Sequence, residues 1–254
     1  MNLKLKNKKV FICSADTDLG AACVAEYLKE GSKINATCLS AKKLKRLLKR
    51  FDADENDKNL NILINDISNE KDRLIIKKSV QLTDILITHV SGPPSGDFLK
   101  WTNEDWLKSF NDIFLTSAQL INFALPRMRD KRSGSIINIS SMTTNFPMHN
   151  LELSTVSRTA LEGFTKSIAK KNDFPGININ SILPGYFLTE SLENFIKSNP
   201  KSDQENIKLK LLEKIPVGRF GKPEDFAKLC CFLSSEYGRF ISGQSILING
   251  GQVS

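Results

Sequence analysis

The sequence lacks several features that define whole classes of protein. No apolar run approaches the roughly 18 residues that cross a bilayer, and the first residues, Met-Asn-Leu-Lys-Leu-Lys-Asn-Lys-Lys, lack the apolar stretch of a signal peptide. The five cysteines are an odd number, show no metal-ligand spacing and lie inside apolar runs. We therefore expect a soluble, cytoplasmic protein with free buried thiols, no metal site and no membrane partner.

A concentrated basic patch is also missing, although the formal net charge is +8. Lysines are spread along the chain among many Asn and Ile residues. The densest basic group lies between positions 42 and 50, where Leu44, Leu47 and Leu48 recur at helical spacing. This pattern predicts a helix with one buried stripe and one solvated basic side. It favours a solvent-facing helix over a nucleic-acid-binding surface, so we expect no nucleic-acid partner.

Linkers, internal repeats and low-complexity tracts are absent too, so residues 1–254 are predicted to form one domain. Short apolar runs alternate with amphipathic stretches along the whole chain. The predicted strands are Val10–Cys13, Ile34–Leu39, Leu60–Asn65, Asp84–His89, Ser135–Ile139, Ile177–Leu183 and Ser245–Ile248. The predicted helices lie near 20–30, 41–51, 69–80, 102–130, 153–172 and 223–235.

The strand runs are almost continuously apolar, which is typical of parallel strands covered on both faces. Their alternation with helices predicts an α/β fold, a single Rossmann-type doubly wound sheet of seven parallel strands with helices on both faces. The polar stretch at about 188–212 interrupts this alternation and is predicted to be a mobile helical flap. In such a sheet ligands bind outside the carboxyl ends of the strands, which the flap would cover.

Several motifs follow one another in a familiar order. They are Val10–Gly20, Asn65-Asp66-Ile67, Asn138-Ile139-Ser140-Ser141, Asn180–Thr189, Gly218–Asp225, Ser242-Gly243-Gln244 and Asn249-Gly250-Gly251. Together they resemble the short-chain dehydrogenase/reductase family over nearly the whole chain, and most of all its bacterial 3-oxoacyl-carrier-protein reductase-like members. The resemblance implies an oxidoreductase that uses a nicotinamide dinucleotide and acts on a small carbonyl or alcohol substrate.

The catalytic positions depart from the family pattern. The resemblance places the catalytic serine at Ser141, but the tyrosine position is Ser154, the lysine position is Arg158 and the asparagine position is Ile113. A serine hydroxyl is far less acidic than a phenol, and an arginine stays charged and cannot shuttle a proton. Ser154 and Arg158 are one helical turn apart, so both could face the crevice, where Arg158 could still hold a ribose, a phosphate or a developing alkoxide.

Other residues could supply a proton. His149 lies between Ser141 and Ser154, and His89 ends the fourth predicted strand. A lone histidine is more often structural or exposed, so the two interpretations stay open. Ser141 could polarise a carbonyl oxygen or cap the strand end. The loop from Ser91 to Phe98, with Ser154 and Arg158, resembles a subgroup that carries a Gly-Pro-Pro loop and a Ser/Arg pair.

The cofactor loop departs from the pattern as well. The resemblance implies cofactor-binding positions at Ser14, Asp18, Leu19, Gly20, Leu39, Ser40, Asp66, Ile67, Arg158, Pro184, Gly185 and Thr189. Two of them, Ser14 and Asp18, stand where the family has glycines. A carboxylate about 4 Å from a phosphate costs on the order of 4 kcal/mol at an effective dielectric constant near 20. Asp18 could avoid this cost by turning outward to cap the helix that begins at Leu19.

The end of the second predicted strand has no acidic residue and has Lys42 and Lys43 close by, which favours NADP(H) over NAD(H), or no cofactor at all. Three functions are therefore open. They are an NADP-dependent carbonyl reductase, a non-catalytic scaffold or partner subunit, and a lyase or isomerase in which Arg158 holds an anionic substrate. The helices at 102–130 and 153–172 form the usual dimer interface in the family, so we expect a homo-dimer or homo-tetramer.

Overall fold

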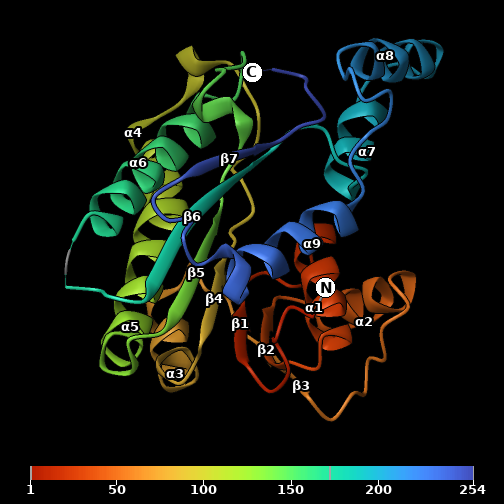
Figure 1. Ribbon diagram of the computed structural model, residues 1–254. Helices are drawn as coiled ribbons and strands as arrows, with labels where there is room; N and C mark the ends of the chain where they lie inside the picture. The colour runs from red at the N-terminus through yellow and green to blue at the C-terminus, as the bar shows by residue number, and fades with distance from the viewer. Residues whose placement is uncertain (1, 172, 254) are drawn as a thin grey trace.

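The computed structural model describes residues 2–171 and 173–253 and is built on one seven-stranded parallel sheet. The strand order is β3-β2-β1-β4-β5-β6-β7, and every neighbouring pair is parallel (Figure 1). The strands are β1 (Lys9–Ile12), β2 (Lys33–Cys38), β3 (Leu60–Ile64), β4 (Ile85–Thr88), β5 (Gly134–Ile139), β6 (Ile177–Pro184) and β7 (Ser245–Ile248). The predicted doubly wound Rossmann-type sheet is confirmed, and each strand end lies within one residue of its prediction.

Helices cover both faces of this sheet. They are α1 (Asp18–Lys29), α2 (Ala41–Arg50), α3 (Glu70–Gln81), α4 (Asn103–Phe110), α5 (Thr116–Lys131), α6 (Glu152–Ala169), α7 (Glu190–Lys197), α8 (Lys201–Glu213) and α9 (Pro223–Ser234). Figure 1 shows α1, α2 and α9 on one face and α3, α4, α5 and α6 on the other. Successive strand residues point to opposite faces. In β1, Val10 and Ile12 therefore join the core under α1 and α9, whereas Phe11 joins the core under α3 and α5.

The segment predicted as one helix over 102–130 is divided into three parts. A π-helical turn, η2 (Asn111–Leu115), separates α4 from α5. The carbonyl of Asn111 accepts both the backbone N–H of Thr116, as a π-helical turn requires, and the hydroxyl of Thr116 at 3.1 Å. Such a turn depends on local packing rather than on apolar period, so the periodicity could not predict it. Helix α6 ends at Ala169, and position 172 of the predicted helix lies outside the described residues.

The segment at 188–212 is helical, as predicted, and consists of α7 and most of α8. No residue of α7 is buried, and only Leu211 of α8 is, in a small cluster with Ile215 and Phe220. The pair therefore rests lightly on the rest of the molecule (Figure 1).

The cysteines, the helix lengths and the metal-binding side chains bear on the expectations drawn from missing features. All five cysteines are free and buried, as predicted. In residues 2–171 and 173–253, no helix has both the length and the apolar character that a membrane span requires. Within the same residues, no cluster of His, Cys, Asp and Glu could hold a metal ion.

Candidate active site

The residues singled out from the sequence gather at the carboxyl edge of the sheet. Ser14 follows β1, Leu39 and Ser40 follow β2, Asp66 and Ile67 follow β3, Ser141 follows β5, and Gly185 and Thr189 follow β6. Because the strands are parallel, these ends meet along one edge. Helix α6 brings Ser154 and Arg158 to the ends of β4 and β5. The residues thus lie at one edge of the sheet, while their roles, and the assignment of this edge as the site, remain predictions.

Arg158 is bound to the main chain of the sheet. Its Nη1 donates to the carbonyl of Ile139 at 2.8 Å, and its Nη2 donates to the carbonyl of Val90 at 3.2 Å. Its Nε donates to Oγ of Ser154 at 3.0 Å. The residue is only 6% exposed, and burial lowers the pKa of its guanidinium to about 10. Arg158 therefore stays charged at neutral pH, and it fastens β4, β5 and α6 together.

Ser154 lies close to the loop that follows β4. A Cβ placed on Gly92 would lie 3.5 Å from Oγ of Ser154 and 3.6 Å from Nη2 of Arg158. Those distances are ordinary van der Waals contact, so a side chain at position 92 would just touch the pair, and the Gly-Pro-Pro loop lies beside Ser154 and Arg158.

Ser141 caps the short helix η3 (Met142–Thr144). Its Oγ accepts hydrogen bonds from the backbone N–H of Thr143 at 3.2 Å and from the hydroxyl of Thr143 at 3.0 Å. The capping alternative is therefore what the structure contains. The hydroxyl proton of Ser141 is not used in either bond, so it remains able to donate to a carbonyl oxygen.

The two histidines have different surroundings. His149 is exposed, and among the described residues no hydrogen bond joins it to Ser141, Ser154 or Arg158. Burial, and then the positive charge of Arg158, lower the pKa of His89 to about 3. His89 is thus neutral at physiological pH and cannot act as a general acid there.

Ile113 occupies the position of the family's asparagine. It is 1% exposed and lies in the π-helical turn η2. Its apolar side chain offers neither donor nor acceptor to a water molecule, so a proton relay through this position has no support. Nearby, the hydroxyls of Ser109 and Ser157 bond to one another at 2.9 Å, and that of Ser109 also donates to the carbonyl of Leu153.

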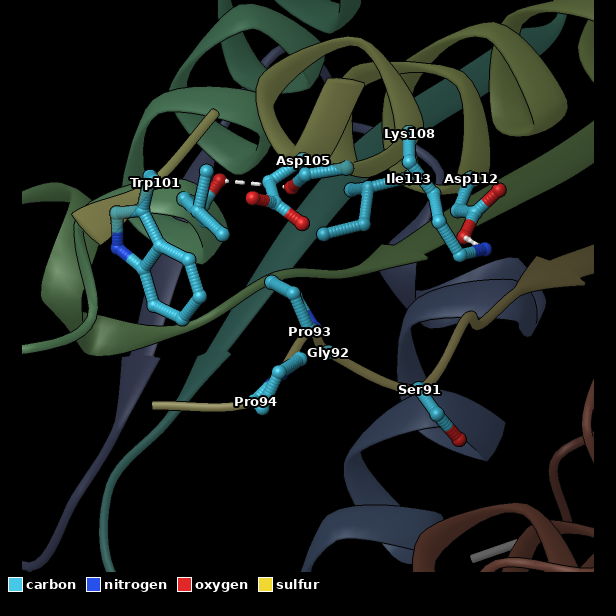
Figure 2. Close-up of a pocket in the computed structure, with 11 residues that line it drawn as sticks. Ser91, Gly92, Pro93, Pro94, Trp101, Asp105, Lys108, Asp112 and Ile113 are labelled. Carbon is cyan, nitrogen blue, oxygen red and sulfur yellow. Dashed lines mark hydrogen bonds and ion pairs between the residues drawn. The ribbon is translucent and has the colours of Figure 1, made fainter. Parts of the chain in front are cut away.

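A cavity of about 240 Å³ lies between the Gly-Pro-Pro loop and α4 with η2. Figure 2 shows side chains of that helical stretch directed toward Pro93 and Pro94. Its charged groups are already paired, since Lys108 binds Asp112 at 2.6 Å and Asp105 closes the capping box of α4 with Thr102. Sequence reasoning did not find this cavity, although the proline pair was its visible signal.

The loop between β1 and α1 retains only the last glycine of the motif, Gly20. Ser14 adopts a left-handed φ of 46°, a conformation that normally favours glycine. Gly20 is required for close packing, because a Cβ there would lie 2.5 Å from the carbonyl oxygen of Ser14. The N-cap of α1 is Thr17, whose side chain accepts from the N–H of Gly20. The alternative in which Asp18 caps this helix is therefore not what the structure contains.

Asp18 turns instead toward two other helices. One carboxylate oxygen accepts from Nη1 of Arg50 at 2.8 Å, and the other accepts from the backbone N–H of Glu190 at 2.8 Å. Glu190 is the first residue of α7, so this N–H is one of the helix's unpaired N-terminal donors. Asp18 is 5% exposed and links α1, α2 and α7.

Asp16 makes a similar arrangement at the end of β2. One oxygen of its carboxylate accepts from the backbone N–H groups of Leu39 and Ser40, at 3.1 and 3.0 Å. Ser40 is the N-cap of α2. Asp16 is 9% exposed, so this contact is also buried. In the same region, Lys43 forms an ion pair with Glu190 at 2.7 Å.

The segment after β6 is fixed by close packing and by a helix cap. Gly185 leaves room for Asn249, because a Cβ on Gly185 would lie 2.7 Å from the Cβ of Asn249. Thr189 caps α7 by accepting from the N–H of Leu192 at 3.3 Å. Asp66 is exposed, and its carboxylate accepts from Ser68.

Comparisons with known proteins agree with this geometry. The family model described as enoyl-(acyl carrier protein) reductase matches residues 14–252. The chain is 28% identical over 249 residues to dehydrogenase/reductase SDR family member 6 of Aquarana catesbeiana, covering 98% of both chains. It is 27% identical over 254 residues to 3-oxoacyl-(acyl-carrier-protein) reductase FabG of Thermotoga maritima, covering 99% of this chain and all of that one.

Solved structures show the same fold. L-sorbose reductase from Gluconobacter frateurii, described in complex with NADPH and L-sorbose, superposes with a TM-score of 0.88 at 22% identity, covering 100% of this chain and 99% of that one. YwfH, described as an NADPH-dependent reductase of bacilysin biosynthesis, also gives 0.88 at 22% identity, covering 98% and 99%. The chain belongs to the short-chain dehydrogenase/reductase family of oxidoreductases. Membership of the Ser/Arg subgroup remains a prediction.

The family's cofactor can be tested against the residues that would meet its phosphates. In this type of sheet the pyrophosphate lies at the N-terminus of the helix after β1, and the adenosine ribose lies at the end of β2. Here the carboxylate of Asp18 lies at the first place and that of Asp16 at the second, each already accepting backbone N–H bonds. A carboxylate accepts hydrogen bonds but cannot donate them, so neither side chain can bind a phosphate oxygen. The residues present do not fit a dinucleotide.

Proposed function

We propose that this protein is a non-catalytic member of the short-chain dehydrogenase/reductase family and acts as a scaffold or partner subunit. The observation that carries the proposal is the binding of Arg158 to the carbonyls of Ile139 and Val90. The residue at the lysine position therefore serves the fold. Its Nε, Nη1 and Nη2 all donate to acceptors of the protein itself, which leaves few of its five N–H donors for a ribose or an alkoxide.

In residues 2–171 and 173–253 no tyrosine hydrogen-bonds to Ser141, Ser154 or Arg158. Of the three tyrosines, Tyr27 is buried against α9 and bonds to the carbonyl of Cys230, and Tyr237 lies beyond α9 in η4 (Glu236–Gly238). Tyr186 packs against the cluster formed by α8 and the residues that follow it, and burial raises the pKa of its phenol. A raised pKa weakens a phenol as a proton donor near neutral pH.

An exposed apolar face supports the subunit role. Leu107 of α4 is 71% exposed, and Val156 of α6 is 50% exposed. Phe110 is exposed beside them and stacks on Phe114, which contacts Phe164 of α6. Exposed clusters of large apolar side chains commonly mark protein interfaces. The expected partner is a second copy of the chain or a catalytically complete relative.

An activity assay on the purified chain tests the proposal. NADPH oxidation is followed with a panel of 3-oxoacyl thioesters, ketones and sugars, for the wild type and for Ser141→Ala. We expect no substrate-dependent oxidation in either protein. Turnover by the wild type that Ser141→Ala abolishes would overturn the proposal, because it would show that the family's serine still works.

A carbonyl reductase is the second candidate, and one observation favours it. Ser141 retains a hydroxyl proton that could bind a carbonyl oxygen, and the related proteins are named as reductases. This candidate requires Asp16 and Asp18 to release their N–H donors before a dinucleotide can bind. The lyase or isomerase gains no support, since it depends on a free Arg158.

A further inference from the structure

The carboxylates of Asp16 and Asp18 both accept backbone N–H groups, in addition to placing acidic side chains in the segment after β1. Each accepts the kind of hydrogen bond that a phosphate oxygen accepts in a nucleotide cleft, from backbone N–H groups at the start of a helix. Asp18 does so at the start of α7, and Asp16 does so at the start of α2. The starts of α2 and α7 belong to different parts of the fold. At both of them an aspartate side chain accepts the backbone N–H that a ligand oxygen could otherwise accept.

We propose that Asp16 and Asp18 are built-in substitutes for the phosphates of a dinucleotide, which hold the cleft in its closed form and exclude the cofactor. This inference is independent of the proposed function, because it uses none of the residues on α6. It assigns to both aspartates a role that the family's glycine-rich loop does not have.

The contacts of Asp18 explain how the cleft is held closed. The Asp18 carboxylate spans from α1 to the N–H of Glu190. Arg50 neutralises its charge at 2.8 Å, and Lys43 holds the Glu190 side chain at 2.7 Å. Helix α7 has no buried residue, so these bonds are a large part of what fixes its first turn.

The contacts of Asp16 explain why the adenosine end is closed as well. Leu39 and Ser40 directly follow β2, the strand end at which the adenosine ribose lies in this type of sheet. Their backbone N–H groups are both directed at one oxygen of Asp16. An incoming phosphate would meet the charge of Asp16 and find the donors already used. Lys43, whose position near the end of β2 favoured NADP(H) in the sequence analysis, is paired with Glu190.

The test is an equilibrium titration with NADPH, followed by its fluorescence, on four proteins. These are the wild type, Asp18→Gly, the double variant Asp16→Asn with Asp18→Gly, and Asp130→Asn as a control. Asp130 is an exposed acid near the end of α5, so its change alters the net charge without touching the cleft. We expect Asp18→Gly to tighten NADPH binding about a hundredfold and the double variant to tighten it further, with no change for Asp130→Asn.

Equal NADPH affinity in all four proteins would overturn the inference, and so would micromolar binding by the wild type. If Asp18→Gly proves unstable, Asp18→Asn keeps the size of the side chain and removes only the charge, and it should still gain affinity. Hydrogen exchange supplies a readout without ligand. The Glu190 amide should exchange at least tenfold faster in Asp18→Gly than in the wild type, and an unchanged rate would contradict the closing role.

These outcomes are separable from those of the proposed function. A double variant that binds NADPH but reduces nothing supports both ideas. A double variant that binds NADPH and reduces a carbonyl leaves the inference intact and overturns the view that the catalytic end is inactive.

Discussion

The cleft has a phosphate end and a catalytic end, and the two ends differ in how a side chain occupies main-chain hydrogen-bonding groups. At the phosphate end, side-chain acceptors occupy main-chain donors, as Asp18 does with the N–H of Glu190. At the catalytic end, a side-chain donor occupies main-chain acceptors, as Arg158 does with the carbonyls of Ile139 and Val90. At the phosphate end the side chain takes the place of a ligand. At the catalytic end the side chain stabilises the fold and takes no part in a reaction. The first arrangement should therefore be reversible by removing two carboxylates, but the second should not be reversible without loss of stability.

Replacing Arg158 should have the largest effect on the free energy of unfolding. In Arg158→Met the carbonyls of Ile139 and Val90 lose their donor in a buried place, and each unsatisfied group costs about 1–3 kcal/mol. We expect a loss of about 3–5 kcal/mol in urea unfolding. Lys166→Met, on the exposed side of the same helix, is the control and should stay within about 0.5 kcal/mol. A small effect at Arg158 would mean that this residue is not structural.

The second prediction concerns pH and the catalytic end. Burial and the charge of Arg158 hold the pKa of His89 at about 3, while an unfolded histidine titrates near 6.5. Below pH 6.5 the unfolded chain binds a proton that the folded chain does not, so this residue lowers stability as the pH falls toward 3. One proton gives at most about 1.4 kcal/mol per pH unit, or about 2 kcal/mol between pH 6.5 and pH 5.

The measurement is the free energy of unfolding of the wild type and of His89→Gln at pH 8, 6.5 and 5. The variant should lose less stability on acidification than the wild type by up to about 2 kcal/mol. Parallel pH profiles would show that His89 is not held neutral by its surroundings.

Ser154 should contribute less. In Ser154→Ala the Nε of Arg158 loses one acceptor, at 3.0 Å, while the other bonds of Arg158 remain. Thermal or urea unfolding should show a loss of about 1 kcal/mol. Ser154→Tyr with Arg158→Lys should not restore reductase activity, because Ile113 still offers no donor or acceptor to a proton relay, and Asp18 still accepts the N–H of Glu190. Activity in this double variant would show that the Ser154 and Arg158 positions alone account for the inactive catalytic end.

Replacing Arg50 should have the smallest effect on the free energy of unfolding, in contrast to replacing Arg158. Its side chain is 48% exposed, so water screens its ion pair with Asp18. Arg50→Met is expected to lower the free energy of unfolding by about 0.5 kcal/mol. A cost comparable to that of Arg158→Met would show that the two ends of the cleft are built in the same way.

Much of this arrangement could be predicted from the sequence, because it depends on short-range patterns. The apolar runs indicated all seven strands, and the motif order indicated which loops would meet at the carboxyl edge. Gly20 was correctly assigned to helix–strand packing, as the contact with Ser14 shows. The empty catalytic positions at Ser154, Arg158 and Ile113 were also visible.

What the sequence could not supply were bonds between distant segments. Asp18 binds the N–H of a residue 172 positions away, and no local pattern predicts that partner. The alternative in which Asp18 caps α1 is not what the structure contains, because Thr17, one residue earlier, caps this helix. Arg158 finds its acceptors at the ends of β4 and β5, which only the assembled sheet brings together. The π-helical turn around Ile113 likewise depends on packing against α6.

The most direct test of this account is the binding of NADPH to the unmodified protein, measured by fluorescence titration at neutral pH. If both phosphate positions are occupied by the chain's own carboxylates, no saturable binding should occur up to about 1 mM cofactor. Saturable binding with a dissociation constant of about 10 μM or tighter would contradict the account, because it would require Asp16 and Asp18 to yield their donors at little cost.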